Sequence, residues 1–306
     1  MIFQDFPSNH DLETLSIDFN ASLYDDSADH SLSLDFLPDG SYPKIRGSYR
    51  GFLLLDCNPC LYLWNPSTGV NKEILVFNSY NNYFKLLFGF GYDLSSDDYI
   101  VLLGSYKYNY SNTNSINLEI FSLKANKWKQ VKVVSDFPYR SAKSSEFCFK
   151  VRSFLNRSIH WLVYNFVTGK DVIIAFDLKE ATMPEIALPN DCSPGNYDLF
   201  VSGGLISVWT VEMSTLKIWV MQEYAMHSSW TKTLDFSFHP ALDFSPVCFT
   251  NCGDIVGPSD DGGLVKLNDK GQLLEYHSYG DRYVTRSKMA VYTESLFSLP
   301  DGTEQA

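Results

Sequence analysis

The amino-acid sequence predicts an all-β fold, a β-propeller of about six four-stranded blades. Aromatic residues make up 15% of the 306 residues, and their flat side chains suit the pleated surface of a strand better than a helix. Short apolar runs recur along the whole chain, each bounded by Gly, Pro, Asn, Asp or Ser. These runs group into units of roughly 40–50 residues, which is the spacing expected of propeller blades.

Five such units follow one another through the middle of the chain. In each, a strand and a turn precede a second apolar strand, a variable loop, a third strand rich in Leu, Ile or Phe, and a short fourth strand. We expect the units to span residues 45–77, 88–134, 147–188, 199–236 and 247–277. Their clearest strands are residues 51–56, 61–64, 99–103, 118–123, 172–178, 205–211 and 216–221. None of these runs carries a helical stripe longer than about ten residues.

The two ends of the chain supply the remaining strands, which we expect at residues 12–19, 32–37 and 289–299. An open ring would leave sheet edges exposed to aggregation, so both termini should share one blade and close the propeller. The domain is therefore expected to span residues 12–299, with tails at residues 1–11 and 300–306. The polar stretch at residues 107–117 should be a long hairpin loop.

The chain is acidic, with 24 Lys and Arg against 36 Asp and Glu and a formal net charge of −12. Such a chain repels phosphate groups, so binding to nucleic acid or to an anionic membrane is not expected. No apolar run reaches the about 18 residues of a membrane-spanning helix, and the first residues lack the features of a secretory signal. We therefore expect a cytoplasmic or nuclear protein whose six cysteines stay reduced.

Cysteine, histidine and paired carboxylates are the candidates for chemistry. Cys57 and Cys60 have the C-x-x-C spacing of zinc ligands or of a redox pair. A zinc site would also need Cys248 and Cys252, which are distant and unusually spaced, so ordinary buried or loop thiols are expected. His160 lies on an apolar strand and is expected to be a core residue. The carboxylate pairs at residues 25–26, 97–98 and 260–261 suit turns.

Three motifs that are common in enzymes do not occur in the sequence. It contains no H-E-x-x-H, no P-loop and no G-x-S-x-G. We predict no catalytic, cofactor-binding or metal-binding residues, and a protein that is not an enzyme. The alternative is a propeller enzyme that acts on carbohydrate, which would gather charged or metal-binding groups in a central channel.

Several segments, in order over nearly the whole chain, resemble the F-box-associated domain of the large plant F-box protein family. They are residues 47–55 (GSYRGFLLL), 63–69 (LWNPSTG), 88–93 (FGFGYD), 98–101 (DYIV), 159–162 (IHWL), 175–178 (AFDL), 218–221 (IWVM), 229–232 (SWTK) and 292–296 (YTESL). The family's usual Asn-Gly turn before the His-Trp pair is replaced here by Asn156-Arg157.

The resemblance implies the target-holding part of a substrate-recognition subunit of a cullin–RING ubiquitin ligase. In such subunits N-terminal F-box helices bind the Skp adaptor, and the propeller holds the target protein. Nothing like an F-box precedes residue 12. We therefore expect a target protein as partner, and the Skp adaptor only if an F-box is supplied elsewhere. A non-functional truncated fragment is the other alternative.

The resembling segments also have a physical interpretation as parts of a propeller. Trp64 ends a strand, and the turn that follows it contains a Pro that presets φ and a Gly that supplies positive φ. Gly89 and Gly91 flank Phe90 inside a strand, and glycine inside a strand marks a close approach of neighbouring backbone. A crowded innermost strand would explain both glycines.

A binding face follows from strand order. In a four-stranded antiparallel blade, the loop between strands two and three emerges on the same face as the connector into strand one. In the repeat at residues 88–134 these segments are residues 78–85 and 105–115. The matching loops elsewhere are residues 164–170, 211–215 and 258–262. The repeat at residues 88–134 and the connector before it bring six aromatic residues to this face: Tyr80, Tyr83, Phe84, Tyr106, Tyr108 and Tyr110. They are our candidate protein-binding residues, since tyrosine is enriched at interfaces; alternatively they cover the edge of their own blade.

Overall fold

The computed structural model describes residues 2–5, 13–25, 29–76, 83–107, 115–141, 153–192, 196–240, 242, 244–259, 263–278 and 288–299. Regular structure in these residues is β-strand, apart from one 3-10 turn at His227–Ser229. The prediction of an all-β chain is therefore confirmed. The chain divides into two compact units.

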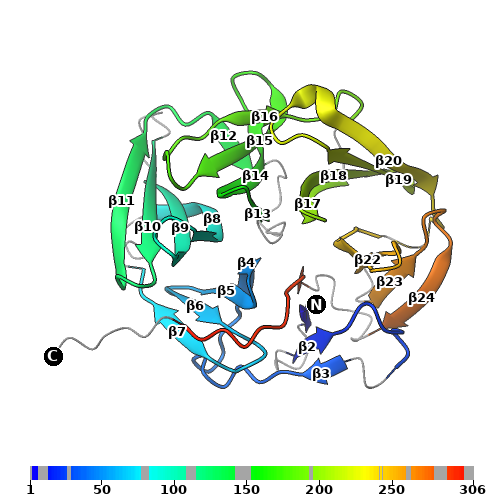
Figure 1. The fold of residues 1–306 in the computed structure, drawn as a ribbon, viewed down its shortest axis with the longest axis horizontal. Coiled ribbons are helices and arrows are strands. Elements are labelled where there is room, and N and C mark those ends of the chain that lie inside the picture. Colours follow the sequence, from blue (N-terminus) through cyan, green and yellow to red (C-terminus); the bar gives the residue numbers. More distant parts are fainter. Residues whose placement is uncertain are drawn as a thin grey trace. The chain divides into compact units, whose positions relative to one another are not determined.

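The first unit, Met1–Tyr42 with Pro189–Tyr292, holds three antiparallel sheets (Figure 1). One sheet contains β1 (Ile2–Asp5), β2 (Glu13–Ile17), β3 (Asp29–Ser31) and β25 (Lys288–Ala290). The next contains β17 (Asn196–Ser202), β18 (Leu205–Glu212), β19 (Thr215–Met221) and β20 (Trp230–Ser237). The third contains β21 (Cys248–Phe249), β22 (Ile255–Pro258), β23 (Gly263–Leu267) and β24 (Leu273–Ser278).

The second unit, Pro43–Leu188 with Thr293–Ala306, also holds three antiparallel sheets. The first contains β4 (Lys44–Tyr49), β5 (Phe52–Cys57), β6 (Cys60–Trp64) and β7 (Asn71–Ile74). The next contains β8 (Tyr83–Asp93), β9 (Asp98–Lys107), β10 (Ile116–Ser122) and β11 (Lys127–Val134). The third contains β12 (Tyr139–Ser141), β13 (Ser153–Leu155), β14 (Ser158–Asn165), β15 (Lys170–Asp177) and β16 (Glu185–Ala187).

Each of the five units expected from the sequence forms one sheet, but the expected six four-stranded blades are not observed. Five sheets have four strands, and the β12–β16 sheet has five. β12 pairs with residues 163–165 of β14, whereas β13 pairs with residues 158–160 of the same strand. Two short strands thus share an edge of β14 where one strand was expected.

The chain ends also differ from expectation. β1 lies inside the segment expected to be a tail, and it pairs with both β2 and β25, so strands from the two ends do share a sheet. Residues 32–37 form no strand: the Leu37 N–H donates to the Leu34 carbonyl at 2.9 Å, and the Asp35 N–H donates to Ser33 Oγ at 3.2 Å. Such local bonds compete with strand pairing. Closure of a ring through this sheet stays a prediction.

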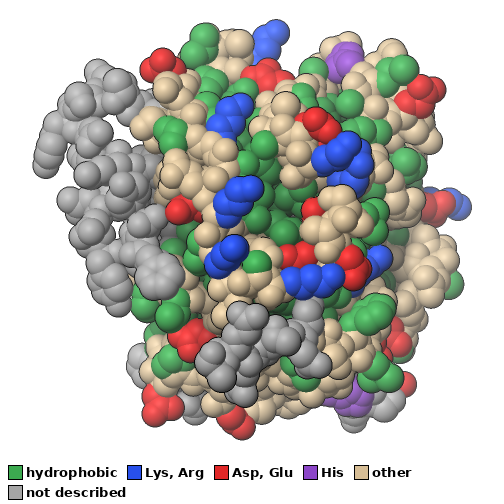
Figure 2. Space-filling model, turned by 60° about the vertical axis from the view of Figure 1, so that its left-hand side comes forward, with side chains coloured by type: hydrophobic (Ala, Val, Ile, Leu, Met, Phe, Trp, Pro, Cys, Tyr) green, Lys and Arg blue, Asp and Glu red, His purple; other side chains and the backbone are tan. Residues whose placement is uncertain are grey.

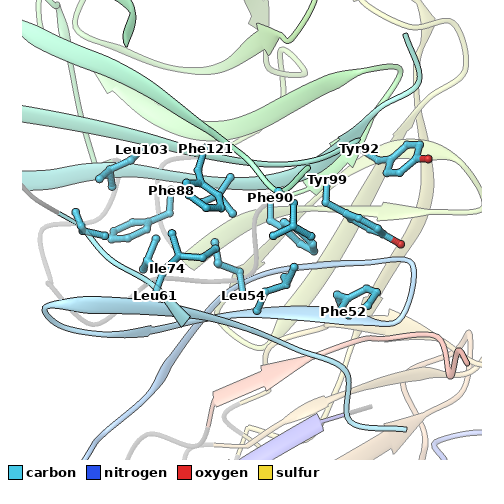
Figure 3. Close-up of a cluster of buried hydrophobic side chains, with 14 residues drawn as sticks. Phe52, Leu54, Leu61, Ile74, Phe88, Phe90, Tyr92, Tyr99, Leu103 and Phe121 are labelled. Atoms are coloured by element: carbon cyan, nitrogen blue, oxygen red, sulfur yellow. The ribbon is translucent and has the colours of Figure 1, made fainter. Parts of the chain in front are cut away.

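The core of each unit lies between successive sheets. In the second unit, Figure 3 shows Leu54 and Leu61 of the β4–β7 sheet facing Phe88, Phe90 and Phe121 of the β8–β11 sheet. These five side chains are at most 5% exposed. Truncating one such Phe to Ala typically costs about 3–5 kcal/mol, so this cluster contributes strongly to holding the two sheets together.

The two glycines of β8 lie against the β12–β16 sheet. A Cβ on Gly89 would lie 2.6 Å from Cδ1 of Ile159, and a Cβ on Gly91 would overlap the ring of Phe154. The indole N–H of Trp161 donates to the Phe88 carbonyl at 2.7 Å across the same boundary. Side chains of the β12–β16 sheet, and not the neighbouring backbone that the sequence predicts, therefore fill the space at these glycines.

β11 forms an edge of its sheet and carries exposed lysines at residues 127, 129 and 132. Figure 2, in which the side that carries β11 comes forward, shows Lys and Arg side chains spaced among hydrophobic and polar ones. Charged side chains along an edge strand oppose pairing with a second chain. The lysines of β11 therefore protect this sheet edge against pairing with a strand of another chain.

Candidate functional site

Three of the aromatic residues predicted to bind a partner lie at one end of β8 and β9. β8 begins at Tyr83 and β9 ends at Lys107, so Tyr83, Phe84 and Tyr106 belong to strands and not to the loops expected there. Phe84 lies opposite Tyr106 in the antiparallel register. Aromatic residues favour strands, which explains why the hairpin extends this far. Outside the described residues lie Tyr80, Tyr108 and Tyr110.

The β14–β15 turn occupies the corresponding end of the β12–β16 sheet, within residues 164–170 of the expected binding face. Its tip exposes two apolar side chains, Phe166 at 45% and Val167 at 75%. Asn165 fixes the tip: its carbonyl accepts the Gly169 N–H at 2.9 Å, and its Oδ1 accepts the Val167 N–H at 2.9 Å. A turn fixed in this way loses little entropy when its tip binds a partner.

Tyrosine and arginine side chains flank this tip. The Arg140 guanidinium carbon lies 4.6 Å from the ring centroid of Tyr164, a cation–π contact. The Tyr139 hydroxyl donates to Glu185 Oε1 at 2.6 Å, and the same oxygen accepts the Asn165 amide at 2.8 Å. Burial and this carboxylate raise the pKa of Tyr139 well above its usual range, so its hydroxyl remains a donor. We use "aromatic rim" for Tyr139, Arg140, Tyr164, Phe166 and Val167.

A cavity of about 540 Å³ lies at the opposite end of these sheets, where no site was expected from the sequence. Its walls come from the ends of β4 and β13 and from the β8–β9 and β13–β14 turns. The lining residues of this "turn cavity" are Tyr49, Leu94, Phe154, Leu155, Asn156 and Arg157. Gly91 is the one sequence signal that could have indicated this cavity, because the space beside it is filled by the ring of Phe154, a lining residue.

Stacked aromatic rings and a cation form one wall of the turn cavity. The ring of Tyr49 meets that of Phe154 edge-on at a centroid distance of 4.8 Å, and it stacks on that of Tyr92 at 6.4 Å. The Arg50 guanidinium carbon lies 4.2 Å from the Tyr92 centroid. Figure 3 shows the Tyr92 hydroxyl pointing away from the buried cluster; it donates to Asp97. The wall is therefore apolar with a polar, positively charged margin.

The chain's C-terminal segment, residues 293–299, lies along the β4–β5 and β6–β7 turns, and Figure 1 draws it in red beside that sheet. The buried Asn65 amide donates to the carbonyls of Ser295 at 2.9 Å and Phe297 at 3.1 Å. Ser295 also fills the space where Gly51 would carry a side chain. Leu296 and Phe297 remain 86% and 58% exposed. The strand expected over residues 289–299 therefore ends at Ala290.

Two of the residues considered for catalysis or metal binding, His160 and Cys248, are buried, whereas Asp26, Asp260 and Asp261 lie outside the described residues. His160 and Trp161 are fully buried in β14. Burial raises the pKa of Cys248 to about 12, so that thiol stays protonated. Among the described residues, no group of three or more His, Cys, Asp or Glu side chains is placed to hold a metal ion. No helix in the described part of the chain is long and apolar enough to span a membrane.

The chain is similar to curated F-box proteins of Arabidopsis thaliana. It is 26% identical over 235 residues to F-box protein CPR1, covering 65% of this chain and 55% of that protein. It is 25% identical over 254 residues to F-box/kelch-repeat protein At3g23880, covering 79% of this chain and 63% of that protein. The chain thus spans between half and two thirds of the length of these relatives.

Among solved structures, Raptor of Chaetomium thermophilum aligns over 81% of this chain and 22% of that chain, at 10% identity and a TM-score of 0.45, a likeness too weak to support an argument. The family comparison is far more extensive. Residues 8–267 match the F-box associated beta propeller domain. Because this match covers most of the chain, the sheets are blades of a β-propeller, and the chain belongs to the F-box associated β-propeller family.

Proposed function

We propose that this chain is the target-holding propeller of an F-box type substrate receptor for a cullin–RING ubiquitin ligase. The family match over residues 8–267 carries the proposal, and the similarity to F-box proteins of Arabidopsis thaliana supports it. In this proposal the propeller binds a protein and catalyses no reaction. Adaptor binding belongs to an F-box segment rather than to the blades, and the protein acts in the cytoplasm or nucleus.

We place target binding on the face that carries the aromatic rim and the Phe84–Tyr106 end of β8 and β9. Phe166 and Val167 present apolar surface on a turn held by hydrogen bonds. Tyr139 and Tyr164 supply rings with polar tips, and tyrosine and arginine are enriched at protein interfaces. The centroid of the Phe137 ring lies 5.0 Å from that of Tyr139, and Phe137 belongs to the same buried cluster as Leu87 of β8. This shared packing supports treating the neighbouring ends of the β8–β11 and β12–β16 sheets as one surface.

Affinity capture with rim variants tests this proposal. The full chain would be immobilised and exposed to plant extract, and retained proteins would be quantified by mass spectrometry, with the Skp adaptor scored separately from other proteins. The double variant Phe166→Ser, Val167→Ser and the triple variant Tyr106→Ser, Tyr108→Ser, Tyr110→Ser should each reduce capture of specific targets about tenfold or more, as expected when interface anchors are lost.

A matched control carries Leu273→Ser and Leu274→Ser, two adjacent apolar residues that are 49% and 45% exposed in the first unit. This control should retain the targets. Circular dichroism and thermal melting must show that all variants are folded. If folded rim variants retained every target at the wild-type level, target binding at this face would be refuted.

A further inference from the structure

The turn cavity combines apolar walls with positive charge, although the whole chain has a net charge of −12. Four of its six lining residues are Tyr, Leu or Phe, the others are Asn156 and Arg157, and none is acidic. Leu94 adds an apolar side chain that is 64% exposed. An occupant must therefore offer apolar surface and must tolerate or seek a cation.

Arg157 is placed in the cavity wall by an unfavourable backbone conformation. Asn156 and Arg157 form the two-residue turn between Leu155 and Ser158, with φ values of 49° and 62°. Such turns strongly favour glycine at the second position, and a larger residue there costs of order 1–3 kcal/mol. The turn itself does not require arginine. We therefore look for a role of the Arg157 guanidinium in binding a ligand at the cavity.

The two cations at the cavity differ in their electrostatic surroundings, because Asp97 offsets part of the charge of Arg50. Among the described residues, the Arg157 guanidinium forms no ion pair with a carboxylate. Asp93, in the β8–β9 turn, accepts hydrogen bonds from two serines of its own turn at 2.7 Å. Asp97 accepts from the Tyr92 hydroxyl and from Lys124 Nζ at 3.0 Å, and these contacts lower its pKa.

We propose that the turn cavity binds a linear peptide segment in which an apolar side chain is followed by Asp or Glu. The apolar side chain packs against Tyr49, Phe154 and Leu94, and the carboxylate pairs with Arg157. Arg50, held over the Tyr92 ring, is a second cation at the margin, and the nearby Asp97 offsets part of its charge. Guanidinium–carboxylate pairs combine charge with two parallel hydrogen bonds, which gives this site selectivity as well as affinity.

This site goes beyond the proposed function because it is a second surface, at the opposite end of the sheets from the aromatic rim. It rests on that function only in taking a protein segment as its ligand. The ligand chemistry can therefore be tested with purified components, without knowledge of any target.

The test uses the full chain and fluorescein-labelled peptides in a Gly-Ser context, with binding followed by fluorescence polarisation. A Leu-Glu-Glu peptide should bind at least about tenfold more tightly than Leu-Gln-Gln, Leu-Lys-Lys or Ser-Glu-Glu peptides. Its affinity should fall as salt rises from about 50 mM to about 500 mM, because ions screen partly exposed pairs. Equal binding of the Glu and Gln peptides would refute the proposal, as would the absence of any binding.

Arg157→Gly separates binding from folding. Glycine relieves the strained φ, so the melting temperature should stay equal or rise, while the preference for the Glu peptide should be lost. Arg140→Gln, which removes a cation from the aromatic rim, is the matched control and should leave peptide binding unchanged. Unchanged binding by Arg157→Gly would overturn the assignment. A peptide with phosphoserines that bound more tightly than the Glu peptide would also overturn the choice of a carboxylate.

The two binding proposals fail in different experiments. Rim variants that lose target capture should still bind the Leu-Glu-Glu peptide, and Arg157→Gly should retain rim-dependent targets. Loss of peptide binding in a folded rim variant would show that the turn cavity is not an independent site.

Discussion

Gly91 and Phe154 show how one side chain constrains the packing of neighbouring sheets. They come from β8 and β13, and the ring of Phe154 fills the space next to Gly91 where any other residue would place its Cβ. The same ring meets Tyr49 at 4.8 Å in the wall of the turn cavity. The absence of a side chain at Gly91 thus shapes both the core and the cavity.

Gly91→Ala is therefore expected to lower the free energy of unfolding by about 1–3 kcal/mol, the usual cost of overpacking a core. Urea denaturation followed by tryptophan fluorescence measures this change. Adding Phe154→Ala to Gly91→Ala should recover part of the loss, although Phe154→Ala alone removes packing. Strictly additive effects of the two substitutions would contradict a direct clash.

Two turns of the second unit use the same hydrogen-bond pattern for different purposes. In each, an asparagine carbonyl accepts the N–H of a glycine four residues later at 2.9 Å: Asn65 from Gly69, and Asn165 from Gly169. Each asparagine Oδ1 also accepts an N–H from two residues later at 2.9 Å. The amide nitrogens have different partners, because that of Asn65 binds the C-terminal segment whereas that of Asn165 binds Glu185.

Asn65→Ala should accordingly release the C-terminal segment and cost about 1–3 kcal/mol, since it removes a buried donor that satisfies two carbonyls. Limited proteolysis read by mass spectrometry should show faster cleavage within residues 293–299. Asn71→Ala is the matched control, because the Asn71 amide donates only to the Gly69 carbonyl on an exposed surface. Equal cleavage rates in wild type and Asn65→Ala would refute this role.

Strands were more predictable from the sequence than the sites. Alternating and apolar runs bounded by turn residues identified the five middle units, because a half-buried strand must repeat its pattern every two residues. Residues 32–37 show the same pattern but form a turn, because serine and backbone groups bond locally. The turn cavity escaped prediction because its residues come from the strand ends and turns of three different sheets, and sequence periodicity does not indicate which of these meet. Strand order alone predicted that the loop containing Phe166 and Val167 belongs to the binding face, and both side chains are exposed there.

At the scale of the whole molecule, four tyrosines with raised pKa values make the stability of the second unit depend on pH. Burial raises the pKa of Tyr62 and Tyr99, the hydrogen bond to Asp97 raises that of Tyr92, and burial with Glu185 raises that of Tyr139. All four residues belong to the second unit. A folded state that raises the pKa of an acid retains its proton longer than the unfolded chain does. The corresponding stability is complete below the ordinary tyrosine pKa of about 10 and is lost as pH rises above it.

The urea midpoint should therefore fall progressively above about pH 10, with tyrosinate absorbance appearing together with unfolding. Tyr139→Phe tests the largest contribution. At neutral pH the variant should be less stable by about 1 kcal/mol, because Glu185 loses a donor. Above pH 10 the wild type must surrender the Tyr139 proton or unfold, whereas phenylalanine has no proton to lose. The stability difference should consequently shrink and then reverse as pH rises. A constant difference between the two proteins from neutral to alkaline pH would contradict the link between Tyr139 burial and alkaline unfolding.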